Sequence, residues 1–320
     1  MGKGLDLRAI SGEMRQVEDL MMQSIGSGGS PLREVSLHVL SAGGKRIRPA
    51  MGIAAYFVAG GDDPSRVIPM AAAVEMIHTA TLLHDDIMDQ SDLRRGRPAA
   101  HRKFGVKAAL VTGDFLFSQA FGLCSGYGPE VIGVTAAACR ELAGAEMLQA
   151  TPWRELTEEL CIQIDGRKTG ALMGAGMEAG ALVVGARPGE RESLRRFGHS
   201  VGTAFQIIDD CLDFSLDGST GKPTGGDILG GKATLPVVHA LSRASDADRR
   251  LLEDFLCYPA GSDRLREVVG ALARTGSLDY ARGRAAAFSA AARKELRPLK
   301  GSPHRTLLED ITYYVLDRTS

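Results

Sequence analysis

An excess of charge of one sign is missing from this sequence, and so is any pattern of cysteines. Lysine plus arginine number 38 and aspartate plus glutamate 39, which gives a net charge of −1. We therefore expect no binding to nucleic acid driven by overall charge. The cysteines form no CxxC pair and no pairing with histidine, which argues against a metal centre or a disulfide framework: Cys124, Cys139, Cys161, Cys211 and Cys257. Free thiols are typical of the reducing cytoplasm, where we expect this protein to be.

Long apolar runs and a targeting segment are also missing. The N-terminal residues lack the apolar core of a signal peptide. The longest stretch of small apolar residues, 170–186, is interrupted by Glu178 and is too short and too polar to span a bilayer. We therefore expect no membrane span. Four glycines in this stretch predict close helix packing instead: Gly170, Gly174, Gly176 and Gly180.

Alternating patterns typical of β-strands are almost absent, whereas apolar residues three and four positions apart recur along the chain. This spacing predicts helices at about 5–25, 32–41, 49–60, 64–89, 106–126, 130–149, 155–182, 189–215, 236–244, 247–257, 262–274, 277–297 and 303–317. No linker, repeat or low-complexity tract divides them. We expect one all-α domain, residues 1–320, folded as a large helical bundle.

Two acidic clusters end two of these helices. Asp85, Asp86 and Asp89 end the helix at 64–89, and the same i, i+1, i+4 spacing returns 124 positions later (209 − 85) at the end of the helix at 189–215, in Asp209, Asp210 and Asp213. At roughly 100° per residue the three carboxylates of a cluster share one face, and the negative helix end adds to their repulsion. One such cluster is compatible with a solvated helix end. Two copies indicate cation binding, and hard oxygen ligands favour Mg²⁺ shared with phosphate oxygens.

Basic residues accompany the acids. The segment GGKRIRP at 43–49 places Lys45, Arg46 and Arg48 beside a helix whose first turn suits Pro49, and helix N-termini bind anions. A glycine-rich segment at 218–232 carries two lysines but is not a Walker A loop, because the GxxxxGK[ST] order and a preceding strand are missing. With these residues, the cations exceed what one diphosphate needs: Arg94, Arg95, Lys168, Lys222 and Lys232.

This inventory predicts the ionisation of an allylic diphosphate. A diphosphate held by metal ions is a good leaving group, because the metals stabilise the charge that develops on it. The helix before Asp85 carries alanine, threonine and leucine, so we expect a hydrocarbon in a slot between helices. That slot should be dry, because water would quench a carbocation.

A set of motifs makes this chain resemble a known family. The motifs are GGKRIRP, EMIHTATLLHDDIMD, RRGRP, VTGDFLF, KTG, GTAFQIIDDCLDF and GKPTGGDILGGKATLP. Together they resemble those of the trans-isoprenyl diphosphate synthases (polyprenyl synthetase family), especially the long-chain bacterial branch that includes octaprenyl diphosphate synthases. The resemblance covers roughly residues 30 to 300. It implies an isoprenoid synthase fold with a central cavity, and repeated head-to-tail condensation of isopentenyl diphosphate with an allylic diphosphate.

The resemblance implies a role for each of the charged residues. Asp85, Asp86 and Asp89 would bind Mg²⁺ on one side of the allylic diphosphate. Asp209, supported by Asp210 and Asp213, would bind Mg²⁺ on the other side, with about three ions per active site. The side chains that would contact the allylic diphosphate are Arg94, Lys168, Lys222 and Lys232. Those that would hold isopentenyl diphosphate are Lys45, Arg48, His78 and Arg95.

The remaining residues of the site receive smaller roles. Thr169 and Gln206 would lie near the reacting carbon, where their oxygens stabilise cationic charge. We expect supporting roles for His84 and Asp92, and we expect Arg46 to point to solvent. This chain departs from the family at 166–170, where Gly170 replaces a more usual alanine and Arg167 is an additional cation that we expect to be solvated.

Chain length is predicted from the residues before the first acidic cluster. Ala80 and Thr81 are small where short-chain synthases tend to carry an aromatic, so we expect a product longer than C20, with Met76, Ile77 and Met147 as the floor of the slot. A homodimer through 106–149 and a peripheral membrane contact for product release are also expected.

Three alternatives remain. The first is a short-chain synthase making farnesyl or geranylgeranyl diphosphate. The second is a non-catalytic subunit of a heteromeric synthase, against which the completeness of both acidic clusters argues. The third is a terpene cyclase, against which the cations expected to hold isopentenyl diphosphate argue.

Overall fold

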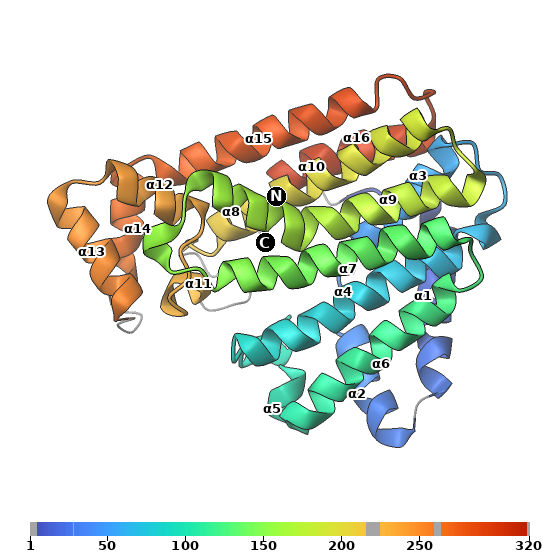
Figure 1. The fold of residues 1–320 in the computed structure, drawn as a ribbon, viewed down its shortest axis with the longest axis horizontal. Helices are drawn as coiled ribbons and strands as arrows, with labels where there is room; N and C mark the ends of the chain where they lie inside the picture. The colour runs from blue at the N-terminus through green and yellow to red at the C-terminus, as the bar shows by residue number, and fades with distance from the viewer. Residues whose placement is uncertain (1–4, 28, 216–224, 259–263, 319–320) are drawn as a thin grey trace.

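The computed structural model describes residues 5–27, 29–215, 225–258 and 264–318 (Figure 1). The prediction of an all-α fold is confirmed. In the described ranges the strands form one short hairpin, β1 (Leu93–Arg94) and β2 (Arg97–Pro98), with Arg94 opposite Arg97. This hairpin was not expected from the sequence. It turns at Arg95 and Gly96, which both have positive φ angles, 52° and 72°, as a two-residue hairpin loop requires.

The helices are α1 (Ser11–Ser24), α2 (Ser30–Leu40), α3 (Ile47–Val58), α4 (Ile68–Met88), α5 (Ala100–Phe104), α6 (Val106–Cys124), α7 (Pro129–Gln149), α8 (Glu158–Asp165), α9 (Ala171–Val184), α10 (Pro188–Leu212), α11 (Gly226–Leu229), α12 (Leu235–Arg243), α13 (Asp246–Cys257), α14 (Leu265–Arg274), α15 (Ser277–Glu295) and α16 (Pro303–Leu316). The short helices α5 and α11 were not predicted. The helix predicted at 155–182 is two helices, α8 and α9, joined by a π-helical turn, Gly166–Gly170.

Local sequence explains where these helices begin. Proline occupies the first or second position of α2, α4, α7, α10, α12 and α16, where its missing N–H has no intrahelical partner to lose. The side-chain oxygens of Thr157, Ser245 and Ser302 accept first-turn N–H groups of α8, α13 and α16. Each such cap contributes roughly 1 kcal/mol to helix stability.

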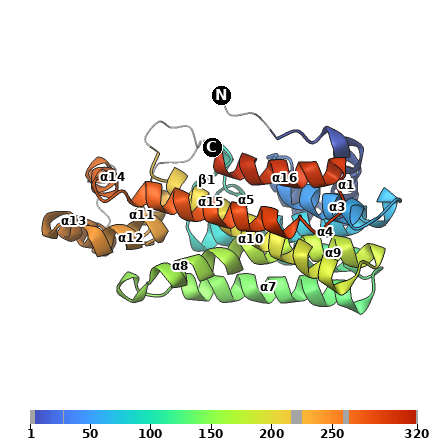
Figure 2. The same ribbon diagram turned by 90° about the horizontal axis from the view of Figure 1, so that it is seen from above.

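The helices pack side by side in layers (Figure 2). Seen from above, α7 and α8 lie on one side, α9 and α10 lie in the middle, and α1 and α16 lie on the opposite side. The helices α12, α13 and α14 gather at one end of the molecule. Within the described part of the chain, one helical stretch, Pro64–Met88, is long and apolar enough to cross a membrane, but 72% of its most apolar window is buried in the protein. An apolar core helix passes the same test.

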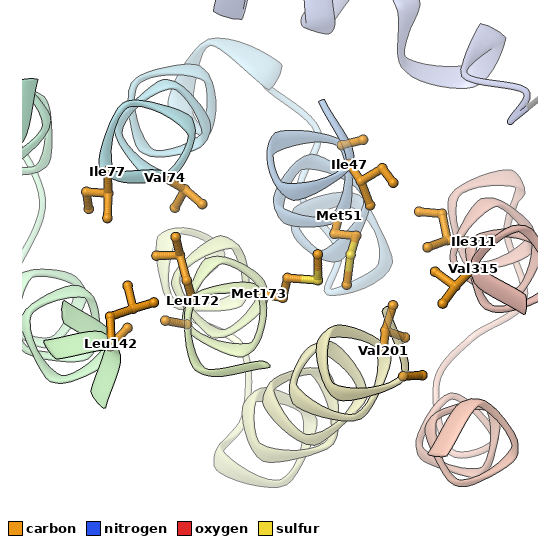
Figure 3. Packing of buried hydrophobic residues seen from close by; sticks show 14 of the residues in the cluster. Ile47, Met51, Val74, Ile77, Leu142, Leu172, Met173, Val201, Ile311 and Val315 are labelled. Carbon is orange, nitrogen blue, oxygen red and sulfur yellow. The ribbon is translucent and has the colours of Figure 1, made fainter. Parts of the chain in front are cut away.

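The core surrounds α9. Figure 3 shows Leu172 and Met173 of α9 amid apolar side chains from the neighbouring helices, among them Val74 of α4 and Leu142 of α7. Full burial of each such side chain contributes roughly 1.5–3 kcal/mol to the free energy of unfolding.

Glycines let α9 and the π turn approach their neighbours at backbone contact, as predicted. A Cβ on Gly170 would lie 2.7 Å from the carbonyl oxygen of His199 in α10, and a Cβ on Gly180 would lie 2.4 Å from that of Gly52 in α3. Alanine at position 170 does not fit this crossing unless the backbone shifts. The close approach holds the π turn against α10 and thereby brings Lys168 and Thr169 to the site described next.

Candidate active site

The central helices α4 and α10 end at one cavity, and each ends in an acidic cluster. Asp89 directly follows the last residue of α4, and Asp213 directly follows the last residue of α10. The cavity has a volume of about 1750 Å³. The structure therefore brings together two clusters that are far apart in the sequence.

The first cluster divides between the cavity and the core. Asp85 and Asp89 line the cavity, whereas Asp86 is 3% exposed and is not part of its wall. Asp86 instead accepts hydrogen bonds from the guanidinium of Arg94, with Nε of Arg94 2.9 Å from Oδ1 of Asp86. Asp86 thus lies off the cavity wall in the structure, although the equivalent Asp210 of the second cluster lines it, so the ion pair with Arg94 and not the one-residue step of roughly 100° distinguishes the two. Nζ of Lys232 donates to Oδ1 of Asp89 at 2.6 Å.

Lys168 of the π turn approaches the first cluster from the opposite wall. Its Nζ lies 2.5 Å from Oε1 of Glu146 and donates to Oε1 of Gln149 at 2.7 Å. Burial raises the pKa of Asp85 to about 6, against the lowering effect of Lys168 and with a further rise from Glu146. Burial lowers the pKa of Lys168, but Asp85 and Glu146 outweigh it and raise that pKa. Glu146 and Gln149 were not predicted from the sequence, where they are two polar residues in an apolar helix end.

The second cluster lines the cavity with all three of its acids. Nη1 of Arg318 lies 2.8 Å from Oδ1 of Asp209, and the Arg318 guanidinium lies over the ring of Phe205, 3.9 Å from its centroid. Asp213 accepts the backbone N–H groups of Gly226 and Asp227 at 3.0 Å each, and so holds the start of α11. Arg318 was not predicted, because nothing in the sequence places the end of the chain beside α10.

A chain of hydrogen bonds links the second cluster to the π turn. Oγ1 of Thr169 donates to Oε1 of Gln206 at 2.7 Å, and Nε2 of Gln206 donates to Oδ1 of Asp210 at 2.9 Å. Burial raises the pKa of Asp210 well above its usual range, and the nearby charges of Asp165 and Asp227 raise it further. The resemblance implied that Thr169 and Gln206 both lie near the reacting carbon, and in the structure they are hydrogen-bonded to each other. Asp165 and Asp227 were not singled out from the sequence.

A third group of side chains, from the segment before α3, from α4 and from the hairpin, is rich in cations. Arg48, His78 and Arg95 line the cavity with Lys45. Burial lowers the pKa of His78 well below its usual range, and the charges of Arg48 and Arg95 lower it further. His78 is therefore neutral at pH 7. The positive charges of Arg48 and Arg95 make this wall of the cavity favourable for an anion. The Arg95 guanidinium packs on Gly44, where a Cβ would lie 2.8 Å from its Nη1 atom.

The expectation that Arg46 points to solvent is wrong. Arg46 is 7% exposed, its Nη1 donates to Oε1 of Glu75 at 2.7 Å, and its Nη2 donates to the carbonyl oxygen of Leu40 at 2.8 Å. Its backbone has a φ of +47°, which turns the side chain inward between α2 and α4. Arg46 therefore anchors the loop that carries Lys45 and Arg48. Lys222 lies outside the described residues.

An apolar arm of the cavity runs between α4, α6 and α7. The residues that line it are Thr81, Leu82, Leu110, Phe117, Cys139, Leu142 and Ala143. The structure does not bring Ala80 or the predicted floor to this wall: Ala80, Met76 and Ile77 are fully buried in the core, and Met147 is 78% exposed. Thr81 is four residues from Asp85 and shares its helix face, whereas Ala80, five residues away, is turned from that face by roughly 140°.

The remaining expected residues lie at the edge of the site. His84 lines the cavity and its Nε2 lies 3.1 Å from the carbonyl oxygen of Leu110. Asp92 is exposed and forms an ion pair with Arg102 at 2.9 Å. Arg167 is not freely solvated, because its Nε donates to Oε2 of Glu141 at 2.6 Å on the side of the π turn away from the cavity.

The donor set fits a hard divalent cation such as Mg²⁺, because carboxylate oxygens are its usual protein ligands. Among the described residues, no three acidic, cysteine or histidine side chains are already gathered closely enough to hold a metal ion. Protein cations occupy several of the carboxylates instead: Arg94 on Asp86, Lys232 on Asp89 and Arg318 on Asp209. If a metal ion and an anionic ligand were bound, the carboxylate of such a pair would contact the metal ion and the cation would contact the anion. Both charges would then stay neutralised.

Sequence comparisons identify the family. A family model described as Polyprenyl synthetase matches residues 30–272. The all-trans-nonaprenyl-diphosphate synthase (geranyl-diphosphate specific) of Rhodobacter capsulatus is 36% identical over 317 residues, covering 98% of this chain and 97% of that protein. The octaprenyl diphosphate synthase of Escherichia coli is 33% identical over 310 residues, covering 96% of each. A short chain isoprenyl diphosphate synthase of Methanothermobacter thermautotrophicus is 38% identical over 296 residues, covering 90% of each.

The fold agrees with these relationships. The crystal structure of a polyprenyl synthase from Caulobacter crescentus, complexed with calcium and isoprenyl diphosphate, matches the whole of this chain and the whole of that one, with a TM-score of 0.94 and 33% identity. Relatives above 30% identity span nearly the full length, and the motifs predicted to form the site line one cavity. The chain therefore belongs to the polyprenyl synthetase family of prenyltransferases.

Proposed function

We propose that this protein, as one domain of residues 1–320, condenses isopentenyl diphosphate with an allylic diphosphate in a Mg²⁺-dependent, head-to-tail reaction in the cytoplasm. The product is a trans-polyprenyl diphosphate longer than C20. One observation carries the proposal: two carboxylate clusters from α4 and α10 meet at a cavity that has a cationic wall on one side and an apolar arm on another.

The cations divide between two diphosphates. Arg94, Lys168 and Lys232 lie beside the acids, where they contact an allylic diphosphate held between the clusters. Arg48, His78 and Arg95 form the separate cationic wall and hold isopentenyl diphosphate. Bound Mg²⁺, about three ions per site, supplies charge neutralisation to the departing diphosphate.

The polar groups beside the reacting carbon stabilise the carbocation that forms there. Oγ1 of Thr169 and Oε1 of Gln206 lie 2.7 Å apart with fixed orientations, so their dipoles need little reorganisation as positive charge develops. The apolar arm behind them keeps water from the growing chain. We name no protein base, since the released diphosphate can take the final proton.

The same proposal includes a homodimer. Two apolar side chains of α6 that do not line the cavity are exposed: Val106 (53%) and Val111 (45%). A second copy would cover this face, and light scattering after size exclusion measures the state. We expect a dimer that Val111→Glu weakens, whereas Arg250→Glu, an exposed charge change on α13, leaves it unchanged. A wild-type monomer contradicts the assignment.

The test of the activity is an incubation with Mg²⁺, labelled isopentenyl diphosphate and, in separate reactions, geranyl or farnesyl diphosphate, followed by sizing of the dephosphorylated products. A ladder that ends above C20 supports the proposal. A ladder that stops at C15 or C20 supports a short-chain synthase. No incorporation by folded protein, with or without an added partner subunit, overturns the proposal, and a cyclic hydrocarbon from the allylic diphosphate alone indicates a cyclase.

A further inference from the structure

The π turn, Gly166–Gly170, carries two successive cations that lie on different sides of it. Lys168 lines the active-site cavity, whereas Arg167 lines a separate groove of about 520 Å³, together with Glu141 of α7 and His199 of α10. The proposed function uses Lys168 and leaves Arg167 without a role. Arg167 directly precedes a proposed diphosphate ligand, so the contacts that hold Arg167 also bear on Lys168.

Two contacts fix Arg167 on α7. Its Nε donates to Oε2 of Glu141 at 2.6 Å. Its guanidinium also packs directly on Gly144, where a Cβ would lie 2.3 Å from Nη2 and 3.1 Å from Cζ. The pair is partly exposed, with 28% of the Arg167 side chain and 49% of the Glu141 side chain accessible, and such a pair alone contributes little to stability. The packing on Gly144 adds the steric part, because only a residue without a Cβ lets the guanidinium lie so close to the helix.

The same helix also contacts Lys168. Its Nζ lies 2.5 Å from Oε1 of Glu146 and 2.7 Å from Oε1 of Gln149, and both residues follow Gly144 on α7. One planar peptide unit joins Arg167 to Lys168, so a shift of the backbone at Arg167 is passed on to Lys168. π-helical turns are rare and occur mostly at functional sites. The outer contacts of Arg167 therefore determine where the turn presents Lys168 to the cavity.

We propose that Arg167, held by Glu141 and Gly144, is a positioning residue that fixes the π turn and thereby the placement of Lys168 in the cavity. The proposal rests on the proposed function, because it takes Lys168 as a ligand of the allylic diphosphate. Arg167 does not line the cavity, so it acts through Lys168. Its effect is specific to the allylic diphosphate and spares isopentenyl diphosphate, whose cationic wall comes from other segments.

The experiment measures the binding of geranyl diphosphate to the full chain by isothermal titration calorimetry, with Mg²⁺ present and isopentenyl diphosphate absent. We expect Arg167→Ala to raise the dissociation constant roughly tenfold, as loss of a residue that supports a ligand does at metal sites. Arg140→Ala removes an exposed arginine next to Glu141. It makes the same change of net charge on the same side of the molecule and should leave the affinity unchanged.

A second variant displaces the guanidinium without changing any charge. In Gly144→Ala the new Cβ meets the far end of the Arg167 side chain, which can move aside, so the protein should fold and bind geranyl diphosphate more weakly than wild type. Gly133→Ala is the matched control on α7, because a Cβ there meets nothing within 4 Å. Since Gly144→Ala acts through Arg167, it should add almost nothing to the loss in Arg167→Ala.

Two further readouts separate positioning from general support of the fold. In a Lys168→Ala background, Arg167→Ala should have almost no further effect on geranyl diphosphate binding, because its route runs through Lys168. In steady-state kinetics, Arg167→Ala should raise the KM for geranyl diphosphate and leave that for isopentenyl diphosphate unchanged. Arg167→Lys, which keeps a charge facing Glu141, should recover part of the affinity. A merely structural role would instead change both KM values together.

The outcome is separable from that of the proposed function. If Lys168→Ala weakens binding and Arg167→Ala does not, Lys168 is a ligand that needs no such support, and only the positioning proposal is wrong. If Lys168→Ala binds geranyl diphosphate as tightly as wild type, the role given to Lys168 in the proposed function is wrong, and the positioning proposal falls with it. Weaker binding in Arg167→Ala that depends on Lys168 supports positioning even when no prenyl product forms.

Discussion

At the scale of single residues, the site is a set of ion pairs whose partners also suit a ligand. Lys232 contacts Asp89 at 2.6 Å, and Arg318 contacts Asp209 at 2.8 Å. Carboxylates are common protein ligands of divalent metal ions, and lysine and arginine side chains commonly bind diphosphate. Under the proposed function, these contacts would compensate the acids until substrate and metal bind together. Arg46 differs, because its partner Glu75 is 2% exposed and lies outside the acidic clusters.

Loss of one partner of the Arg46–Glu75 pair should be costly. Arg46→Met leaves a buried carboxylate without a cation, and we expect the free energy of unfolding to fall by about 3–5 kcal/mol. The double change Arg46→Met/Glu75→Leu removes both charges and should recover most of that loss. Urea denaturation followed by circular dichroism measures both. A single variant within about 0.5 kcal/mol of wild type would show that the pair contributes nothing.

The half-buried carboxyl of Asp85 should make metal-free stability depend on pH. Burial raises its pKa from 3.8 to about 6, so the folded protein binds this proton more tightly than the unfolded chain. Its contribution to the free energy of unfolding is full below about pH 4 and is lost as the pH rises to about 6, by roughly 3 kcal/mol in all. The unfolding free energy of wild type minus that of Asp85→Asn should fall across this window. A difference that stays constant from pH 4 to 7 contradicts the assignment, and Glu159→Gln is the control.

At the scale of elements, glycines set how closely the π turn and α9 approach α10. A Cβ on Gly202 would lie 2.6 Å from Cα of Gly170 and 2.9 Å from the carbonyl oxygen of Thr169. Both obstacles are backbone atoms, which cannot rotate away as a side-chain tip does. The contact therefore positions the segment that carries Lys168 and Thr169 relative to the acids of α10.

Gly202→Ala should separate these two elements. We expect a loss of about 1–3 kcal/mol in unfolding free energy, the usual cost of overpacking, and weaker binding of diphosphate as the π turn shifts. Gly189→Ala lies on the same helix, where a Cβ would meet nothing within 4 Å, and should be neutral or slightly stabilising. Thermal unfolding with and without Mg²⁺ and diphosphate compares the two. Equal behaviour of the two variants would rule out the crossing as a constraint.

At the scale of the whole molecule, α4, α6 and α7 together line the apolar arm, which under the proposed function would hold the hydrocarbon chain. Thr81 of α4 and Phe117 of α6 both line the apolar arm, whereas Ala80 faces the core. We infer that the bulk of these wall residues, more than the size of Ala80, sets the depth of the arm.

We therefore expect Thr81→Phe to shorten the product and Phe117→Ala to lengthen it. Each change alters the volume of the arm and leaves the diphosphate ligands in place, so condensation itself should continue. Chromatography of dephosphorylated products measures the shift. Ala80→Phe is the contrasting variant, since it should destabilise the core by about 1–3 kcal/mol. If Ala80→Phe shortens the product and Thr81→Phe does not, the gate belongs to Ala80 and the placement of the wall is wrong.

Much of the fold and part of the site could be predicted from the sequence alone. Helical periodicity predicted the main helices to within a few residues, apart from α5, α11 and the π turn between α8 and α9. The helices α5 and α11 are too short to show a spacing pattern, and the π turn changes the helical period too little to be detected in the sequence. The i, i+4 spacing of Asp85 and Asp89 also placed two acids on one face correctly, because that spacing is a local property of a helix.

The tertiary structure determines which partners each side chain contacts. Asp86 and Arg46 resemble site residues in the sequence, yet Asp86 pairs with the partly exposed Arg94 and Arg46 pairs with the buried Glu75. Asp165 and Arg318 resemble ordinary charged residues, yet folding brings them to the second acidic cluster. Local spacing determines the face of a helix, but only packing between distant segments determines what that face meets. The sequence by itself therefore established the fold class and the acidic motifs, and the assembled bundle decided the partners.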